Sequence, residues 1–422
     1  MEGTSLYVTA NMFDNGEKLK PFMTYGRTIL IVSVIFLVNS LATGMITPIW
    51  PIYIKNFLNA SMAEVGFVFS ISNAIAAVTQ LLSGFLSDKY GRKRLHALGT
   101  FLAAFPPLMY TLAIKWADLI PWVMLSGVAT GLYMPLRMAI VADSSSTKTM
   151  ASAYSWTNIF WLVGSTVAPF LGGAAADYFG IRFPFFACSA LNFAVFPLAL
   201  MMHETRRKAQ DTTLKNKEGK THFQRGYMLA LLLFSLINII QGVSIGVISP
   251  VIPVFVGSKF PVDYTFIGVL YAIGFGVASI IVQIPGGKCS DLFDRRKIMF
   301  ATFLASSPFF LFFAYSRNTT ELIIFMFLSN AILNASWPAF QTLMMEATPA
   351  SKWGLVNGVS ATTFWVGQTF GNALSGILWE NWGQFAPFYA SSFVIGISAL
   401  PPLFLKETRE KRKVWNWQNQ NI

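Results

Sequence analysis

Long apolar segments, each separated from the next by a short polar loop, recur along this chain from Ile29 to Leu405. A bilayer-spanning helix needs about 20 mostly apolar residues, and about twelve segments of this kind can be placed. In hydrocarbon every backbone N–H and C=O must be bonded within the protein, so these segments must be helical. Their expected starts lie near Thr28, Ala63, Leu95, Leu119, Ala151, Phe183, Tyr227, Thr265, Ile298, Glu321, Val356 and Phe385. Only 12% of residues are charged, about half of the share typical of soluble domains, so we expect an all-α membrane protein.

The net charge of +12 could suggest a nucleic-acid partner, but the position of the basic residues argues against one. With a cytoplasmic N-terminus, 25 of the 31 Lys and Arg fall in cytoplasmic segments, five fall in outer loops, and Arg137 lies within a helix. This asymmetry is the positive-inside rule. The sequence therefore predicts a multi-pass protein of the cell membrane, in contact with lipid, with both termini in the cytoplasm and no nucleic-acid partner.

The two halves of the chain repeat each other with an offset of about 203 residues. The offset relates the loop Gly84–Lys93 to Gly287–Arg296, and it also relates Asp143 to Glu346. Because each half contains six apolar segments and starts on the same side, the repeat is parallel. We expect a cytoplasmic lead (1–26), a six-helix bundle (27–205), a cytoplasmic linker (206–226), a second six-helix bundle (227–409) and a cytoplasmic tail (410–422).

The repeated loops resemble the signature G-x-x-x-D-x-x-G-R-[KR] of the major facilitator superfamily. The first loop matches it in full, through Gly84, Asp88, Gly91, Arg92 and Lys93. The second loop matches with Asp294 in place of the second glycine, through Gly287, Asp291, Arg295 and Arg296. The resemblance extends from about residue 28 to residue 409. It implies two six-helix bundles related by a pseudo-two-fold axis, which move a small solute by alternating access.

In that family the loop is a latch that joins the two halves on the cytoplasmic side in the outward-facing state. Its Arg pairs with an acid at the end of the fourth helix, which here would be Asp143. The resemblance thus implies a set of gate residues in both halves: Asp88, Arg92, Asp143, Asp291, Arg295 and Glu346. The alternative is a structural turn whose charges only set topology.

The predicted fifth helix carries a second, partial motif. Residues 164–173 are similar to G-x-x-x-G-P-x-x-G-G of some proton-coupled exporters of the superfamily, with Ala168 in place of a glycine. Small residues allow close helix packing and proline removes a backbone hydrogen bond, so Pro169, Gly172 and Gly173 are candidate hinge residues. The Arg of the exporters' fourth-helix motif is absent, since Gly127 occupies its position. The fifth-helix motif therefore favours export, whereas the missing Arg of the fourth-helix motif argues against proton antiport.

The resemblance also implies a central cavity lined by the first, fourth, seventh and tenth helices, and the fifth and eleventh helices add further polar positions. Helical spacing selects the candidate substrate contacts: Asn39, Thr43, Trp50, Met134, Arg137, Gln241, Trp337, Gln341, Trp365 and Gln368. The alternative for each residue is packing between helices, where Asn and Gln form hydrogen bonds across the interface.

Charged groups within the predicted spans are few, and two alternatives stay open for Arg137. It is either an anion-binding residue or a structural cation, and its nearness to Asp143 favours the second. We find no Asp, Glu or His near the middle of any predicted span. Protons are a candidate coupling ion, which a helix-end acid such as Asp143 or Glu346 would then carry, and passive facilitation is the alternative.

The pattern excludes several classes of function. His96, His203 and His222 are expected near the cytoplasmic surface without metal-ligand or triad spacing, and there is no phosphate-binding loop. We therefore expect no enzyme, no cofactor and no metal. The favoured hypothesis is a monomeric secondary transporter that exports an amphipathic or apolar organic solute. The alternatives are a facilitator or importer of a small organic anion bound by Arg137, and a non-transporting receptor or scaffold.

Overall fold

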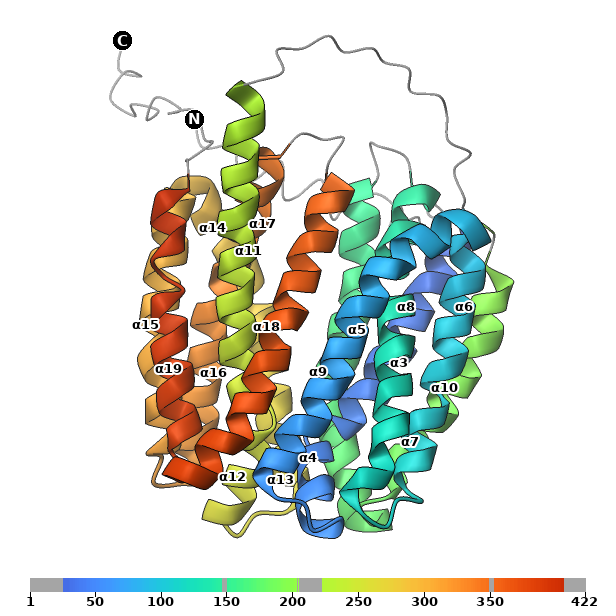
Figure 1. The fold of residues 1–422 in the computed structure, drawn as a ribbon, viewed down its shortest axis with the longest axis vertical. Helices are drawn as coiled ribbons and strands as arrows, with labels where there is room; N and C mark the ends of the chain where they lie inside the picture. The colour runs from blue at the N-terminus through green and yellow to red at the C-terminus, as the bar shows by residue number, and fades with distance from the viewer. Residues whose placement is uncertain (1–25, 146–149, 203, 205–221, 349–352, 406–422) are drawn as a thin grey trace, which may run out of the picture.

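The computed structural model describes residues 26–145, 150–202, 204, 222–348 and 353–405, and these parts of the chain fold into helices joined by short turns (Figure 1). The expected tail and most of the expected lead and linker lie outside the described residues. The second half begins with a helix that starts at His222 rather than near Tyr227. In Figure 1 this helix, α11, projects beyond its neighbours.

The first half contains seven α-helices of at least one and a half turns and three short elements. In chain order its elements are α3 (Arg27–Ile46), α4 (Trp50–Ile52), η1 (Tyr53–Phe57), α5 (Met62–Tyr90), α6 (Arg92–Ala103), α7 (Phe105–Tyr110), η2 (Trp116–Leu119), α8 (Ile120–Ser144), α9 (Met150–Phe179) and α10 (Phe183–Met201). The second half repeats this order. Its elements are α11 (His222–Ile248), α12 (Val251–Lys259), α13 (Tyr264–Tyr271), η3 (Ala272–Val277), α14 (Ala278–Leu292), α15 (Arg295–Ala314), α16 (Thr319–Ala335), α17 (Trp337–Glu346), α18 (Trp353–Trp382), α19 (Ala386–Ile397) and η5 (Pro401–Phe404).

Every expected span start falls in or beside one of these helices, so the all-α prediction is confirmed. Ten helical stretches in the described part of the chain are long and apolar enough to cross a membrane. The two remaining expected spans are α6–α7 and α18. The first is interrupted at Ala104, just before two consecutive prolines, and the second is rich in Gly, Thr and amide side chains. Both run beside longer spans (Figure 1), α6 against α8 and α18 against α5 and α11.

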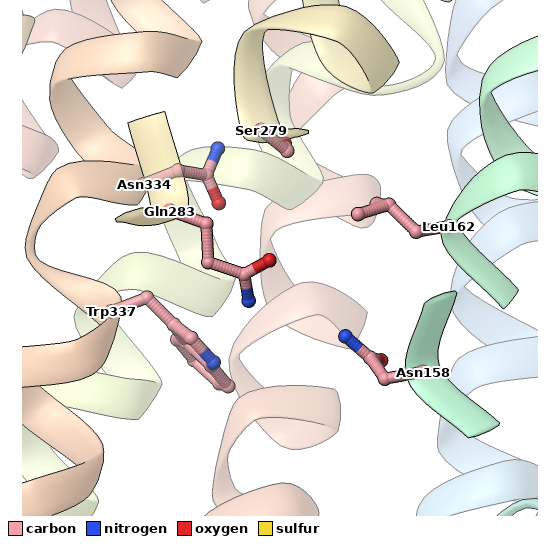
Figure 2. A pocket seen from close by; sticks show the side chains of 6 residues that line it. All are labelled: Asn158, Leu162, Ser279, Gln283, Asn334 and Trp337. Atoms are coloured by element: carbon pink, nitrogen blue, oxygen red, sulfur yellow. The ribbon is translucent and has the colours of Figure 1, made fainter. Parts of the chain in front are cut away.

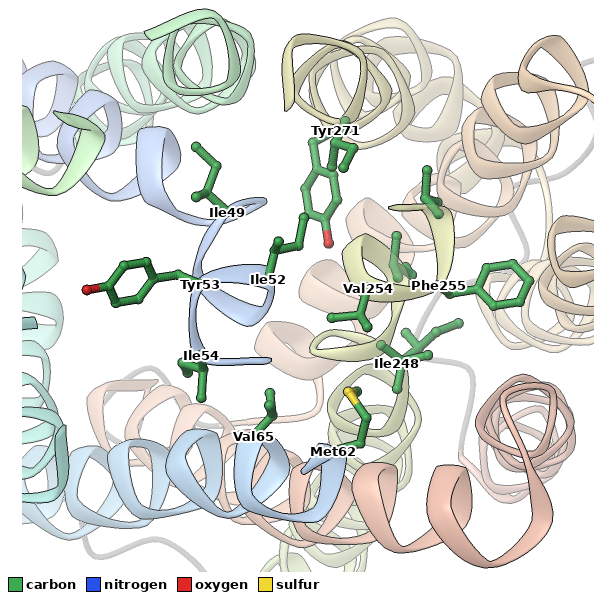
Figure 3. Close-up of a cluster of buried hydrophobic side chains, with 14 of the residues drawn as sticks. Ile49, Ile52, Tyr53, Ile54, Met62, Val65, Ile248, Val254, Phe255 and Tyr271 are labelled. Atoms are coloured by element: carbon green, nitrogen blue, oxygen red, sulfur yellow. The ribbon is translucent and has the colours of Figure 1, made fainter. Parts of the chain in front are cut away.

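The two ends of the molecule differ in charge, and they are named here by that difference. The basic end carries the loops between α5 and α6 and between α14 and α15, with Lys89, Arg92, Lys93, Arg94, Lys288, Arg295, Arg296 and Lys297. The opposite end carries α4, η1 and α12. A large cluster of buried apolar side chains at the opposite end draws on both halves, including Ile52 and Tyr53 from the first and Val254, Phe255 and Tyr271 from the second (Figure 3). Two further clusters near the basic end each draw on one half alone.

Two helix pairs join the halves: α5 packs against α18, and α9 packs against α13 and η3. Glycines allow the close approach. A Cβ on Gly66 of α5 would overlap the backbone of Asn372, and a Cβ on Gly268 of α13 would overlap the backbone of Pro169. Gly66 and Gly268 are repeat mates, so the two interfaces are built in the same way.

Candidate functional site

A cavity of about 260 Å³ lies between the halves (Figure 2). It is lined by residues of α9 in the first half and of α14, α16 and α17 in the second: Asn158, Leu162, Ser279, Gln283, Asn334 and Trp337. In Figure 2 the amides of Asn158 and Gln283 point towards each other across the space. All six side chains are uncharged. Four of them carry an amide or a hydroxyl group that can both donate and accept hydrogen bonds: Asn158, Ser279, Gln283 and Asn334.

Helix geometry explains why these side chains meet. Asn158 and Leu162 are one turn apart on α9, and Ser279 and Gln283 are one turn apart on α14. The helix is interrupted between α16 and α17 at Ser336. Pro338, at the start of α17, has no backbone N–H and so cannot donate a hydrogen bond to a carbonyl of the preceding turn. Trp337 lies at this break with half of its surface exposed.

Of the ten predicted substrate contacts, only Trp337 lines this cavity. Trp50 instead stacks on Tyr110, with ring centroids 4.2 Å apart, within the apolar cluster at the opposite end. Gln368 accepts a hydrogen bond from Asn73 Nδ2 at 3.2 Å, which links α18 to α5. The other predicted contacts lie on the expected helices α3, α8, α11, α17 and α18 without lining the cavity: Asn39, Thr43, Met134, Arg137, Gln241, Gln341 and Trp365.

The ten predicted contacts leave out the other five lining residues. Asn158 and Asn334 lie on helices that were expected to contribute polar positions, whereas Leu162, Ser279 and Gln283 were missed altogether. Ser279 and Gln283 are polar residues at a spacing of four within an otherwise apolar run, which was a usable signal. The prediction gave most weight to the first, fourth, seventh and tenth helices, and the eighth was left out. The packing of α9 against η3 brings the following helix, α14, to the cavity.

Arg137 of α8 contacts two aromatic rings. Its guanidinium carbon is 4.9 Å from the ring centroid of Phe36 on α3 and 4.3 Å from that of Trp161 on α9. Its Nε and Nη1 are buried and have no hydrogen-bond partner among the described residues. Cation–π attraction strengthens when the cation is desolvated, so the rings compensate part of the cost of burying this charge.

The sequence led us to expect His96 near the cytoplasmic surface. In the structure it is instead buried within the first half, with 1% of its surface exposed. It lies in the second turn of α6, which packs against α8, and its ring meets Tyr133 edge to face at 6.4 Å. The expectation was wrong because a residue close to a loop in sequence can still face the interior of the bundle.

The repeated loop of the first half is organised around Gly91, whose φ of 94° favours glycine. Glu204, after α10, accepts hydrogen bonds from the backbone N–H of Arg92 at 3.0 Å and of Lys93 at 3.4 Å, and so caps α6. The Arg92 guanidinium pairs with Asp143 at 2.7 Å. Asp88 lies in the last turn of α5, and its side chain is outside the described part of the structure.

The second loop reaches the same arrangement with a different residue. Asp294, which replaces the glycine, caps α15 by accepting from the backbone N–H of Arg296 at 3.0 Å. It adopts φ −61°, which any residue allows, so the departure from the signature causes no strain. Arg295 pairs with Glu346, the repeat mate of Asp143. Asp291 is exposed at the end of α14.

The candidate hinge residues lie in the second half of α9, which continues as a helix through Pro169. A Cβ on Gly172 would overlap the carbonyl of Met45 on α3, and a Cβ on Gly173 would overlap the carbonyl of Tyr264 on α13. Both glycines are therefore positions of close helix packing in this conformation.

No group of three or more His, Cys, Asp or Glu residues that could hold a metal ion occurs among the described residues. The cavity between the halves is suited to bind a molecule through hydrogen bonds and apolar contact, because all six lining side chains are uncharged.

Comparison with known proteins places the chain in a family. The sequence profile of the Major Facilitator Superfamily matches residues 32–243 and 234–419. The multi-drug resistance efflux pump PmrA of Streptococcus pneumoniae is 25% identical over 367 residues, which cover 85% of this chain and 90% of that protein. Multidrug resistance protein 2 of Bacillus subtilis is 26% identical over 400 residues, which cover 92% and 97%.

Solved structures have the same fold at low sequence identity. A D-xylose–proton symporter aligns with a TM-score of 0.74 and 15% identity, over 90% of this chain and 99% of that one. A bacterial homologue of the human lysosomal transporter Spinster, in an inward-facing and occupied conformation, aligns with a TM-score of 0.72 and 15% identity, over 90% and 96%. With helices, repeat, loops and profile in agreement, the chain belongs to the Major Facilitator Superfamily, and it is a multi-pass membrane transporter and not an enzyme.

Proposed function

We propose that this transporter exports a small amphipathic or apolar organic solute across the cell membrane by alternating access. The observation that carries the proposal is the uncharged lining of the cavity between the halves. A pocket of amide, hydroxyl, indole and aliphatic groups binds such solutes by burying apolar surface and meeting a few hydrogen bonds. The names of the efflux pumps that resemble the chain over most of its length support the same direction of transport.

The distribution of charge supports an orientation with the basic end, and therefore both termini, in the cytoplasm. The apolar cluster shared by both halves then closes the outer side. The cavity residues lie along α9, α14 and α17 on the basic-end side of that cluster, as expected of a conformation that receives cargo from the cytoplasm. We propose a monomer as the functional unit, because one chain supplies both bundles and the cavity between them.

The ion pairs Arg92–Asp143 and Arg295–Glu346 at the basic end support the latch hypothesis for these four residues, and for Asp88 and Asp291 the latch stays a prediction. Arg92 with Asp143 and Arg295 with Glu346 each connect a loop to a helix end within one half. These ion pairs hold each repeated loop in a fixed geometry. In the latch hypothesis the loops then contact the other half when the basic end closes. For Pro169, Gly172 and Gly173 the close packing supports a role in transmitting motion between α3, α9 and α13.

A second candidate function is transport of a small organic anion, and the observation in its favour is Arg137. Its Nε and Nη1 lack a hydrogen-bond partner in the described chain, as a waiting anion site would. The contacts of the guanidinium with the Phe36 and Trp161 rings argue against it, because they already compensate part of the cost of burying this charge without an anion. Export of an uncharged or amphipathic solute is the better supported function.

Transport by purified protein in liposomes tests the proposal. The assay uses three amphipathic fluorescent dyes of similar size, one neutral, one cationic and one anionic, and measures their movement in both directions. We expect wild-type protein to move the neutral or cationic dye, and Gln283→Leu and Trp337→Ala to lower that flux at least about tenfold, since each removes a contact with the cargo. Movement of the anionic dye alone would favour the second candidate, and no movement of any dye would overturn the proposed cargo class.

A further inference from the structure

Two acidic side chains at the opposite end reach from one half of the molecule to the first turn of a helix in the other half. Asp177, in the last turn of α9, accepts hydrogen bonds from the backbone N–H of Tyr264 at 3.1 Å and of Thr265 at 2.7 Å, and from the Thr265 hydroxyl at 2.6 Å. Glu380, in the last turn of α18, accepts from the backbone N–H of Ala63 at 3.2 Å. Carboxylates at helix N-termini are favoured by the unpaired N–H groups and by the helix dipole.

These contacts are related by the internal repeat. Glu380 is the repeat mate of Asp177 at the offset of 203, and the two target turns, in α5 and α13, are also repeat mates. One turn before each acid lies a glycine, Gly173 or Gly376, where a Cβ would overlap the backbone of the target turn. The glycine brings the helix end against the N-terminus of the other half, and the acid one turn later reaches its N–H groups.

Neither target helix needs these acids as its own cap. Asp263 already caps α13 by accepting from the backbone N–H of Phe266 at 2.7 Å. Ser61 and Glu64 form a reciprocal capping box at the start of α5. Asp177 and Glu380 therefore add a contact between halves to helices whose ends are already capped within their own half.

We propose that Asp177 and Glu380 are a symmetric pair of clamps that hold the two halves together at the opposite end and must release for that end to open. The inference rests on the alternating-access function proposed above. Alternating access requires every contact between the halves at the closed end to break and reform. A charge-assisted hydrogen bond to a helix N-terminus is strong enough to bias the equilibrium between the closed and open states of this end. The two contacts lie beside the apolar cluster that contains Ile52 and Val254, since Met62 and Ala176 are also members of that cluster.

The test measures exposure of that cluster directly. Ile52, which is 4% exposed, is replaced by cysteine in a Cys289→Ser background, in which the native Cys188 is buried. Alkylation by a charged maleimide is followed in detergent-purified protein, with the background lacking Ile52→Cys as the blank and Val254→Cys as a second reporter. We expect Asp177→Asn and Glu380→Gln each to raise the alkylation rate about tenfold, the effect of losing one charge-assisted contact, and the double variant to raise it further.

Matched controls separate a clamp from an ordinary helix cap. Asp263→Asn and Glu64→Gln each neutralise an acid at the same helix N-termini but on the helix's own half, and we expect them to leave the rate within about twofold of wild type. Glu380→Asp and Asp177→Glu keep the charge and should restore most of the protection. Equal increases in all four neutralised variants, or no increase in Asp177→Asn and Glu380→Gln, would overturn the clamp. Because labelling needs no transport, the clamp can fail while dye flux persists, and flux can be absent while the clamp holds.

Discussion

Arg137 illustrates how a single residue can be assigned from its surroundings. Two aromatic rings from α3 and α9 contact the guanidinium on α8, so the side chain links three helices of the first half. If it is a structural cation, Arg137→Gln should lower thermal stability and reduce the flux of every dye alike. Cation–π contacts at desolvated sites contribute about 2 kcal/mol, so a loss of several degrees in melting temperature is expected.

The measurement for Arg137 pairs thermal melts with binding isotherms for one anionic and one neutral ligand. Phe36→Leu is the matched control, because it removes one of the two rings and leaves the charge. An unchanged melting temperature together with a selective loss of anion binding in Arg137→Gln would instead assign the residue to substrate.

The two ion pairs at the basic end give a second prediction at this scale. Asp143→Asn and Glu346→Gln are isosteric changes that each remove a negative charge. The Arg that remains differs in burial, since the Arg92 side chain is 24% exposed and the Arg295 side chain is 8% exposed. A cation left without its acid costs more when it is buried, about 3 kcal/mol against about 1 kcal/mol or less.

Glu346→Gln should therefore destabilise the protein more than Asp143→Asn, although Glu346 is itself the more exposed acid, at 41% against 9%. The melting temperatures of the two variants in detergent show which substitution destabilises the protein more. The reverse order would mean that burial of the altered acid, and not of its partner, sets the effect.

At the scale of the helix, close packing of α9 makes the sign of a glycine substitution predictable. Alanine has a higher helix propensity than glycine by about 1 kcal/mol, so Gly→Ala stabilises a helix wherever there is room. Gly358 of α18 has no heavy atom within 4 Å of an added Cβ, whereas at Gly172 the Cβ would overlap Met45. Gly358→Ala should keep or raise the melting temperature, and Gly172→Ala should lower it by an overpacking cost of about 1–3 kcal/mol. Equal melting temperatures would show that α9 can move away from α3 at little cost.

Helices and loops also show where sequence reasoning succeeds and where it stops. The helix positions and the Arg–acid pairs could be predicted, because apolar runs set the spans and the repeat relates Asp143 to Glu346. The cavity lining could not, because it depends on how each helix is rotated and on which helices meet. Trp50 is placed in an apolar cluster by Tyr110 and Phe185, which are remote in sequence, and Gln283 reaches the cavity through packing between the halves.

For the whole molecule, the open question is the energy source. The acids of the described helices lie in first or last turns or in caps, so a proton carrier must act at a helix end. Asp143 and Glu346 are helix-end acids that are repeat mates, and each pairs with an Arg of a repeated loop at the basic end. Protonation would weaken the pair and free the loop, which couples proton binding to movement of this end.

We therefore expect dye export to be driven by a pH gradient that is acidic on the outer side, and to lose that dependence in Asp143→Asn or Glu346→Gln. The measurement is flux in liposomes with and without an imposed gradient, with Asp263→Asn as the control because it alters an acid at the opposite end. A variant that still moves dye down its concentration gradient, but ignores the pH gradient, would locate the coupling acid. Wild-type flux that ignores the gradient would instead mean that protons do not drive this transporter, and that the same alternating movement serves passive facilitation.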